Sequence, residues 1–150
     1  MSGQSPRSLL RMLVLSLATT SLVATGSLVA NAEPKTVLLA GDIAYGTAES
    51  KEAETADLVK SRSGLVITAG DNAYPLGRRE DFQTNYDPTW GRFRGRTRPT
   101  LGNHDYGDPG AAGYFEYFGW RAGPPGRGYY SFKAGSWRVL ALDSEACKRP

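Results

Sequence analysis

The chain has 150 residues, which is enough for one domain and excludes a multidomain assembly. Its composition, with 40% apolar and 22% charged residues, is typical of a globular protein, and glycine and proline gather in the second half, which favours a loop-rich sheet scaffold over a helical bundle. The net charge of +3 includes Arg7 and Arg11 of the N-terminal segment, and the rest of the chain carries only +1, so charge gives no argument for nucleic-acid binding.

Residues 1–32 have the pattern of a secretory signal peptide. A positively charged start is followed by a largely apolar stretch over residues 9–29 and by Ala30-Asn31-Ala32, which has the small-x-small form of a cleavage site. A membrane anchor is the alternative, but serine and threonine dilute the stretch and Gly26 would break its helix. We predict general secretory export without stable membrane insertion, and a secreted mature domain of residues 33–150.

The first part of this mature chain predicts a βαβ unit. Lys35–Ala40 is an apolar run that ends in Gly41-Asp42, and Leu65–Ala69 is a second run that ends in Gly70-Asp71. Both are typical of buried strands. Between them, Glu49–Ser61 combines helix-forming residues with spaced apolar positions, which predicts a helix. A strand, a helix and a strand in this order predict two parallel strands.

The remaining segments predict shorter elements. We expect a short helix over Arg78–Tyr86, a third strand over Thr97–Leu101, and two strands around a tight turn over Tyr129–Lys133 and Ser136–Leu142. Glycines and prolines between Tyr106 and Gly128 predict no regular structure there. The fold class is therefore α/β.

Three predicted strands end in similar polar motifs. Asp42 and Asp71 each follow a glycine, and the third strand is followed by Gly102-Asn103-His104-Asp105, which holds the only histidine of the chain. The carboxyl ends of parallel strands share one edge of a sheet, where ligands bind. A single Gly-Asp after a strand is usually a turn or a helix cap, but the three motifs together predict a site. Carboxylate, amide and imidazole groups suit Mg, Mn, Fe or Zn.

In this order and spacing the motifs resemble those of the calcineurin-like metallophosphoesterases, and in particular the purple acid phosphatase branch. Many members of the wider family have a histidine at the position of Ala44, whereas this branch lacks it and has a tyrosine at the position of Tyr74. The segments Tyr114–Gly119 and Gly128–Ser144 also resemble those that follow the Asn-His motif in secreted bacterial members. The resemblance extends over about residues 35–145.

The resemblance implies an acid phosphatase that hydrolyses phosphate monoesters of small molecules or phosphoproteins with two metal ions, Fe paired with Fe, Zn or Mn. The ions would lie about 3.5–4 Å apart and activate a water molecule. Asp42 and Tyr74 would bind the first ion, Asp71 would bridge both, and Asn103 would bind the second. An aromatic lid is the alternative role for Tyr74.

The resemblance also assigns catalytic roles. His104 would contact the phosphate or donate a proton to the leaving oxygen, and Asp105 would orient it. No nucleic-acid module is implied.

The chain also departs from the family pattern. The family takes three further histidines from later strands, and this sequence has none after His104. The expected fold is thus a metallophosphoesterase αβ-sandwich that is incomplete at its C-terminus, with little activity in isolation. A truncated, inactive fragment or a binding module is the alternative function, and a phosphodiesterase or nucleotidase on the same scaffold is a third.

Three further features of the sequence are a run of arginines, a single cysteine and an incomplete predicted sheet. Arg92, Arg94, Arg96 and Arg98 form a basic run that we interpret as a solvated loop, with electrostatic steering of phosphorylated substrates as the alternative. Cys147 is the only cysteine, so it forms no internal disulfide, and it is the first indication that the chain is a fragment. An incomplete sheet would expose an apolar face, which predicts poor solubility for residues 33–150 alone.

Overall fold

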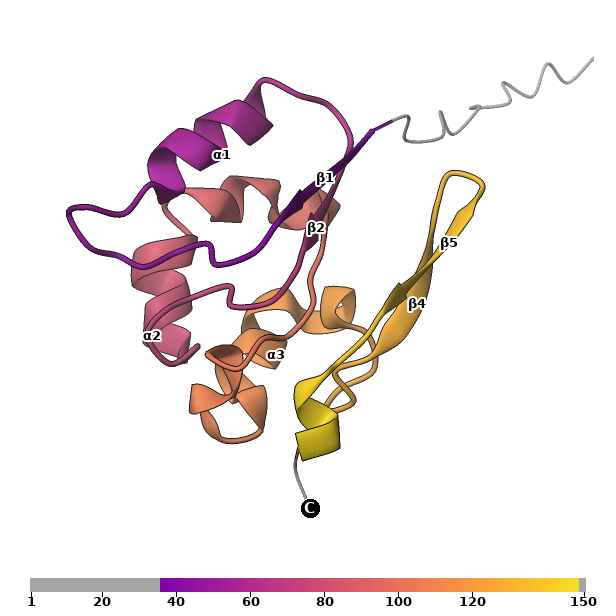
Figure 1. Cartoon of the computed structure of the whole chain (residues 1–150). Helices are drawn as coiled ribbons and strands as arrows, with labels where there is room; N and C mark the ends of the chain where they lie inside the picture. Colours follow the sequence, from indigo (N-terminus) through magenta and orange to yellow (C-terminus); the bar gives the residue numbers. More distant parts are fainter. Residues whose placement is uncertain (1–35, 149–150) are drawn as a thin grey trace, which may run out of the picture. The chain divides into compact units, whose positions relative to one another are not determined.

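The computed structural model describes residues 36–148, all of which belong to one compact unit, Ala32–Pro150. The predicted signal peptide lies outside the described residues. The elements are β1 (Val37–Ala40), α1 (Glu52–Lys60), β2 (Leu65–Thr68), α2 (Arg79–Asp81), β3 (Thr97–Arg98), α3 (Ala112–Phe118), β4 (Tyr130–Ala134) and β5 (Trp137–Ala141). The described chain is thus a mixed α/β structure (Figure 1).

A parallel sheet with the strand order β1-β2-β3 forms the first layer of this unit. Val37 pairs with Leu65 and Ala40 with Thr68, and the helix α1 connects the two strands. The predicted βαβ unit with parallel strands is therefore confirmed. β3 pairs with β2 through only two positions, so the third strand is shorter than its predicted range.

The two faces of this sheet differ in their burial. Leu38 and Ala40 of β1 pack against the core, and Val66 of β2 is completely buried. The alternate positions face the other way, where Val37 and Leu39 of β1 are 46% and 67% exposed. Because successive side chains of a strand point to opposite faces, one face of β1 belongs to the core and the other is open to solvent.

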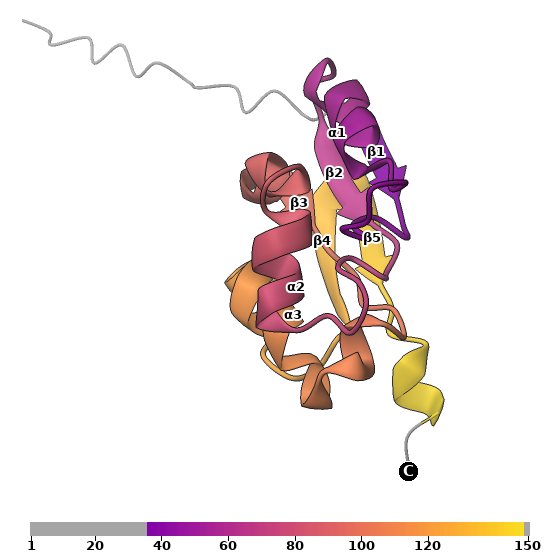
Figure 2. The same ribbon diagram turned by 90° about the vertical axis from the view of Figure 1, so that its left-hand side faces the viewer.

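Aromatic side chains from the helical segments build most of the core. Phe82 and Tyr86 lie on a π-helix that follows α2 directly, and Trp90 and Phe93 lie on the 3-10 helix Trp90–Arg96. The Phe82 and Phe118 rings meet edge to face at 5.6 Å between centroids, which joins the π-helix to α3. Figure 2 shows α2 and α3 side by side.

The helix α3 is an element that the sequence did not predict, because glycine and proline surround it. Gly110 and Ala111 enter it in the left-handed region with φ of 66° and 53°, and Gly119 leaves it with a φ of 57°. Tyr114 and Phe118 are nonetheless buried on its inner face. Packing of these rings, rather than intrinsic helix propensity, therefore stabilises this short helix.

Arg92, Arg94 and Arg96 lie on the 3-10 helix Trp90–Arg96 and Arg98 lies on β3, so the run is not the predicted loop. Arg96 donates hydrogen bonds to the carbonyl oxygens of Val59 and Gly64 at 3.1 and 2.6 Å. Its guanidinium also lies over the Phe93 ring, and that of Arg94 over Tyr117. Several of these arginines therefore pack against the fold, and Arg96 binds the end of α1.

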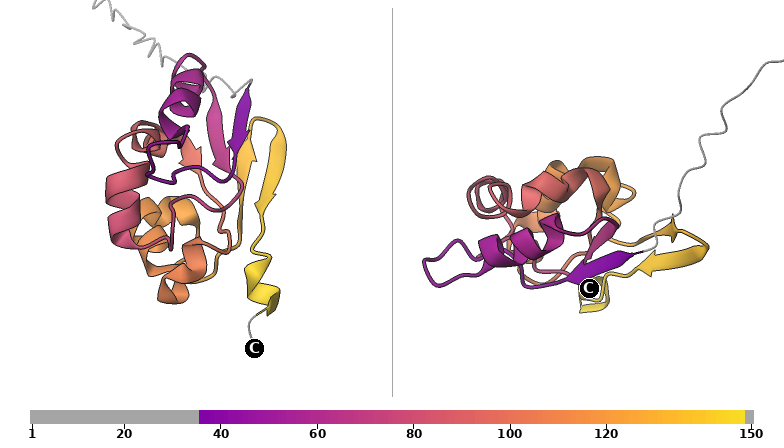
Figure 3. Two further views of the ribbon diagram at one scale, coloured as in Figure 1. Left: turned by 60° about the vertical axis from the view of Figure 1, so that its left-hand side comes forward. Right: turned by 90° about the horizontal axis from the view of Figure 1, so that it is seen from above.

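Strands β4 and β5 form the predicted antiparallel hairpin, with Tyr130 paired to Ala141 and Ala134 to Trp137. The Tyr130 hydroxyl donates to the Pro99 carbonyl at 2.7 Å, which ties the hairpin to the segment after β3. In the views of Figures 1 and 3 the hairpin lies on the opposite side of β1 and β2 from α1 and α2. No helix within residues 36–148 has the length and apolar character needed to cross a bilayer.

Candidate functional site

Two similar segments run side by side where β1 and β2 end. Gly41–Tyr45 and Gly70–Tyr74 remain parallel beyond the strands, and Ala44 and Ala73 form a further parallel bridge. The Ile43 amide donates to the Asp71 carbonyl at 3.0 Å. This pairing sets the Asp42 and Asp71 backbones beside each other at the carboxyl edge of the sheet. Both aspartates have left-handed φ, 53° and 49°, which their short polar side chains tolerate.

Three oxygen atoms gather at this edge. The Tyr74 hydroxyl donates a hydrogen bond to Asp42 Oδ1 at 2.7 Å and lies 3.3 Å from Asp71 Oδ2. Burial, the hydrogen bond to Asp42 and the charges of both carboxylates raise the pKa of Tyr74 above its ordinary value. The phenol therefore keeps its proton between the two carboxylates.

The segment after β3 reaches the same place through its backbone. The His104 amide donates to Asp71 Oδ1 at 2.9 Å, so both oxygens of Asp71 have a partner. Gly102 lies directly against Asp71, in a space that no larger side chain fits. The Asn103 side chain is exposed, and within the described residues no hydrogen bond joins it to the three oxygens.

The His104 ring is oriented by Tyr74 and Pro75. It packs on the Tyr74 ring with centroids 4.3 Å apart and an angle of 43° between the planes. Its Nδ1 atom is 2.8 Å from the Pro75 carbonyl oxygen. A carbonyl only accepts, so Nδ1 carries the hydrogen in this contact, and Nε2 is the nitrogen left for proton exchange.

Asp105 was predicted to orient His104, and its carboxylate instead joins the second motif to the third. The carboxylate is fully buried and accepts hydrogen bonds from the Asn72 amide at 3.1 Å, the Asn72 side chain at 2.9 Å and the Gly102 amide at 2.9 Å. Burial raises the pKa of Asp105 to about 6, against the lowering effect of these hydrogen bonds. In the structure the ring partner of His104 is therefore Pro75, and Asp105 holds the two motif segments together.

Tyr45 is part of the site and was not singled out from the sequence. Its ring stacks on Tyr74 with centroids 3.8 Å apart and planes 12° apart. The signal was present in the sequence, because Gly41-Asp42-Ile43-Ala44-Tyr45 and Gly70-Asp71-Asn72-Ala73-Tyr74 match at four of their positions. Side chains at equivalent positions of two paired parallel segments lie next to each other.

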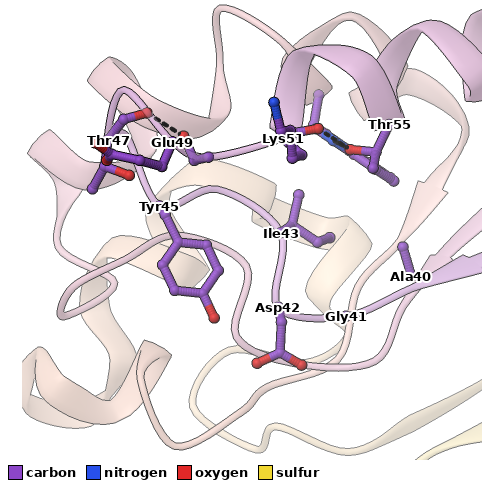
Figure 4. Close-up of a pocket in the computed structure, with 11 residues that line it drawn as sticks. Ala40, Gly41, Asp42, Ile43, Tyr45, Thr47, Glu49, Lys51 and Thr55 are labelled. Carbon is purple, nitrogen blue, oxygen red and sulfur yellow. Dashed lines mark hydrogen bonds between the residues drawn. The ribbon is translucent and has the colours of Figure 1, made fainter.

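A cavity of about 400 Å³ opens beside Asp42 and Tyr45 (Figure 4). In this view the Tyr45 hydroxyl and Asp42 share one end of it, and Lys51 and Thr55 of the α1 segment stand at the other. The lining residues are Ala40, Gly41, Asp42, Ile43, Tyr45, Thr47, Glu49, Ser50, Lys51, Thr55 and Trp90. The cavity is of the size that binds small molecules.

The three gathered oxygens fit one hard cation. Carboxylate and phenolate oxygens are ligands that such ions accept, and here both carboxylates accept from the Tyr74 hydroxyl, whose proton a cation could replace. Within residues 36–148 no group of three or more His, Cys, Asp or Glu residues is arranged to hold a metal ion. The cluster around Tyr74 has two such residues and a phenol. For a second ion these residues offer only Asp71 and the exposed Asn103.

Comparisons of the chain with protein-family models, with curated proteins and with solved structures find no match. Function is therefore inferred from the resemblance of the motifs and from the geometry of the site.

Proposed function

We propose that this protein is a metal-dependent phosphoester hydrolase, an acid phosphatase of the calcineurin-like metallophosphoesterase type with the corresponding αβ-sandwich fold. The observation that carries the proposal is the gathering of Asp42 Oδ1, Asp71 Oδ2 and Tyr74 Oη from two different strand ends. Two carboxylates repel each other, so their approach from two segments is costly unless the Tyr74 proton or a cation lies between them.

Each residue of the site has a role in this proposal. Asp42, Asp71 and Tyr74 would hold the first ion, and Asp71 and Asn103 would offer ligands to a second, with Fe and Fe, Zn or Mn as the pair. When bound, the ions supply positive charge for the phosphoryl oxygens and a nucleophile at neutral pH. The Gly102 contact and the His104 amide fix the Asp71 carboxylate in place for this task.

His104 supplies the proton that the leaving group needs. Its Nδ1 stays bound to the Pro75 carbonyl, so the ring is held while Nε2 exchanges a proton. In the imidazolium form both nitrogens are donors, and Nε2 then protonates the leaving oxygen of the ester. Packing of the ring on Tyr74 keeps His104 next to the proposed first ion.

The substrate and the location follow from the same proposal. A phosphate monoester of a small molecule or of a phosphoprotein is the substrate, and the protein acts after secretion. The exposed position of Asp42 suits a site that meets its substrate from solvent.

Metal binding and hydrolysis test the proposal together. We expect the purified chain to bind Mn²⁺, Zn²⁺ or Fe³⁺ by isothermal titration calorimetry and to hydrolyse 4-nitrophenyl phosphate slowly and only with metal. Asp71→Asn should lower both by a factor on the order of 100 or more, because its carboxylate is a ligand of both proposed ions and accepts from Tyr74 and from the His104 amide. Asp57→Asn, which changes an exposed aspartate of α1, is the matched control and should leave both within about twofold.

Two results would contradict the proposal: hydrolysis that does not depend on metal, or hydrolysis that is the same in Asp71→Asn as in the wild type. Hydrolysis of bis(4-nitrophenyl) phosphate in preference to the monoester would point to a phosphodiesterase on the same site.

A binding module without turnover is the second candidate, and the small number of histidines favours it. The sequence has one histidine, and the second ion has few ligands among the described residues. Binding of one ion per chain, without hydrolysis of either ester, is the result expected for this candidate.

A further inference from the structure

The cavity beside Asp42 extends from the proposed ion site toward α1. Asp42 and the Tyr45 hydroxyl stand at one end, and Lys51 and Thr55 stand at the other (Figure 4). A phosphoryl group held next to Asp42 would therefore leave the rest of its ester facing a space of about 400 Å³. A space of this size accommodates a group as large as a substituted ring.

Tyr45 gives this cavity a flat aromatic surface. Tyr74 covers one face of this ring, with 3.8 Å between the centroids. The other face and the edge of the Tyr45 ring therefore line the cavity. Tyr45 is 44% exposed, which leaves it accessible to a ligand. The stack on Tyr74 also holds the ring in a fixed plane, so that a second ring loses less entropy when it stacks on the first.

The other walls combine apolar side chains with hydroxyl groups, and their charges disfavour an anionic group. Ala40, Ile43 and Trp90 are apolar, and the charge of Lys51 is paired with Glu54 at 3.1 Å. Glu49 is exposed at the rim and would repel an anion.

From these contacts we propose that the cavity binds the planar, uncharged aromatic leaving group of a phosphate monoester, and that Tyr45 is the specificity-determining residue that stacks on it. This inference rests on the proposed phosphoester hydrolysis for the position of the phosphoryl group. It goes beyond that function because it assigns the substrate class to a cavity and to a residue that takes no part in ion binding.

The inference is tested on the full chain with two non-hydrolysable probes. They differ only in the group that takes the place of the leaving group. Phenylphosphonate and methylphosphonate carry the same phosphonate group, and their binding is measured by calorimetry with and without Mn²⁺. We expect phenylphosphonate to bind about tenfold more tightly, because the phenyl ring is buried and stacked. Tyr45→Ala should reduce this preference to about twofold or less, and Tyr45→Phe should retain it.

A matched control comes from the hairpin side of the molecule. Tyr129 is 52% exposed and lines a different cavity, so Tyr129→Ala removes a comparable ring and should leave the preference unchanged. Equal affinity of the wild type for the two probes would overturn the inference, and so would a preference that survives Tyr45→Ala or no binding of either probe.

Hydrolysis separates this inference from the function on which it rests. If the wild type hydrolyses phenyl phosphate and glycerol 2-phosphate with metal but Tyr45→Ala lowers both rates equally, the function stands and the aromatic cavity is wrong. If the phenyl preference depends on Tyr45 but no ester is hydrolysed, the aromatic cavity stands and the proposed function is wrong.

Discussion

The position of the Asp71 carboxylate depends on the absence of a side chain at Gly102. A Cβ atom at this position would overlap Asp71 Oδ1 and the Asp71 amide nitrogen. Gly70 is equally constrained, since its φ is 90° and the Gly102 backbone lies next to it. The two glycines thus let the second and third motifs approach each other closely enough to form one site.

Gly102→Ala should therefore displace Asp71 and weaken ion binding by about 10–100-fold, as changes next to metal ligands do. Calorimetric titration with Mn²⁺ measures the effect. Gly95→Ala is the matched control, because a Cβ at Gly95 meets no atom within 4 Å, and it should bind the ion as the wild type does. Equal affinities in the two variants would contradict the role of Gly102.

Asp105 makes the stability of the site depend on pH. Its pKa is about 6 in the folded chain against an ordinary value of 3.8, chiefly because it is buried. The folded chain therefore keeps this proton over a pH range in which the unfolded chain has lost it. The stabilisation that Asp105 provides is complete below 3.8, its pKa in the unfolded chain, and is lost as the pH rises through about 6.

Asp105→Asn should destabilise the chain by about 1–3 kcal/mol, because an amide cannot accept from all the amide donors around it. We expect the difference in unfolding free energy between wild type and variant to be largest near pH 4 and to shrink as the pH rises through about 6, since only the wild type titrates here. Urea denaturation of metal-free protein at several pH values measures it. A difference in unfolding free energy that increases with rising pH would contradict the raised pKa of Asp105.

The sequence predicted only part of the site at the level of residues. Gly-Asp motifs after parallel strands led to the expected meeting of Asp42 and Asp71, and the structure brings them together at Tyr74. The metal-binding roles of these residues stay predictions. The partners of Asp105 could not be predicted from the sequence, because two of them are the backbone amides of Asn72 and Gly102 and the third, the Asn72 side chain, is 33 residues away.

At the level of elements, α1 is fixed at its C-terminal end by a side chain from a distant segment. The Arg96 guanidinium donates to the carbonyl oxygens of Val59 and Gly64, and it lies over the Phe93 ring. The last carbonyls of a helix have no partner within the helix and carry partial negative charge, so a cation there is favourable.

Arg96→Ala should lower the unfolding free energy by about 1–2 kcal/mol, because two charge-assisted hydrogen bonds are lost. Arg62→Ala changes an exposed arginine just after the same helix and should change it by less than about 0.5 kcal/mol. Thermal denaturation followed by circular dichroism compares the two. Similar effects in both variants would mean that general charge, and not the contact with α1, is responsible.

The strands and helices that the sequence predicted are those with strong local patterns. Apolar runs gave β1 and β2, and helix-forming residues gave α1, each slightly shorter in the structure than predicted. The helix α3 was not predicted because its local sequence opposes a helix, and contacts with distant residues, such as the Phe82 ring and Arg79, stabilise it. Local patterns carry no information on such contacts.

At the scale of the whole molecule, large apolar side chains remain exposed on both sheets. Leu39 of β1 is 67% exposed, and Trp137 and Leu140 of β5 are 77% and 65% exposed. Apolar groups on strands at the edges of sheets favour association between chains.

Residues 33–150 expressed alone should therefore be poorly soluble and should associate as their concentration rises. Sedimentation velocity over a range of concentrations tests this, and Leu39→Lys with Leu140→Lys should reduce the association because both positions become charged. A monodisperse wild-type monomer with a sharp, cooperative thermal transition would contradict the prediction.

The hydrogen bonds of Tyr74 have a consequence for the stoichiometry of ion uptake. The phenol proton lies where the proposed cation would bind, so the cation enters only as this proton leaves. Uptake of one ion should release about one proton to the solvent, and the apparent affinity should rise about tenfold for each unit of pH while Tyr74 is the group that gives up its proton. In Tyr74→Phe there is no such proton to expel, and a weakly buffered solution should then change little in pH during the titration. Protons and metal ions would thus compete for the Tyr74 oxygen, and metal binding would weaken as the pH falls.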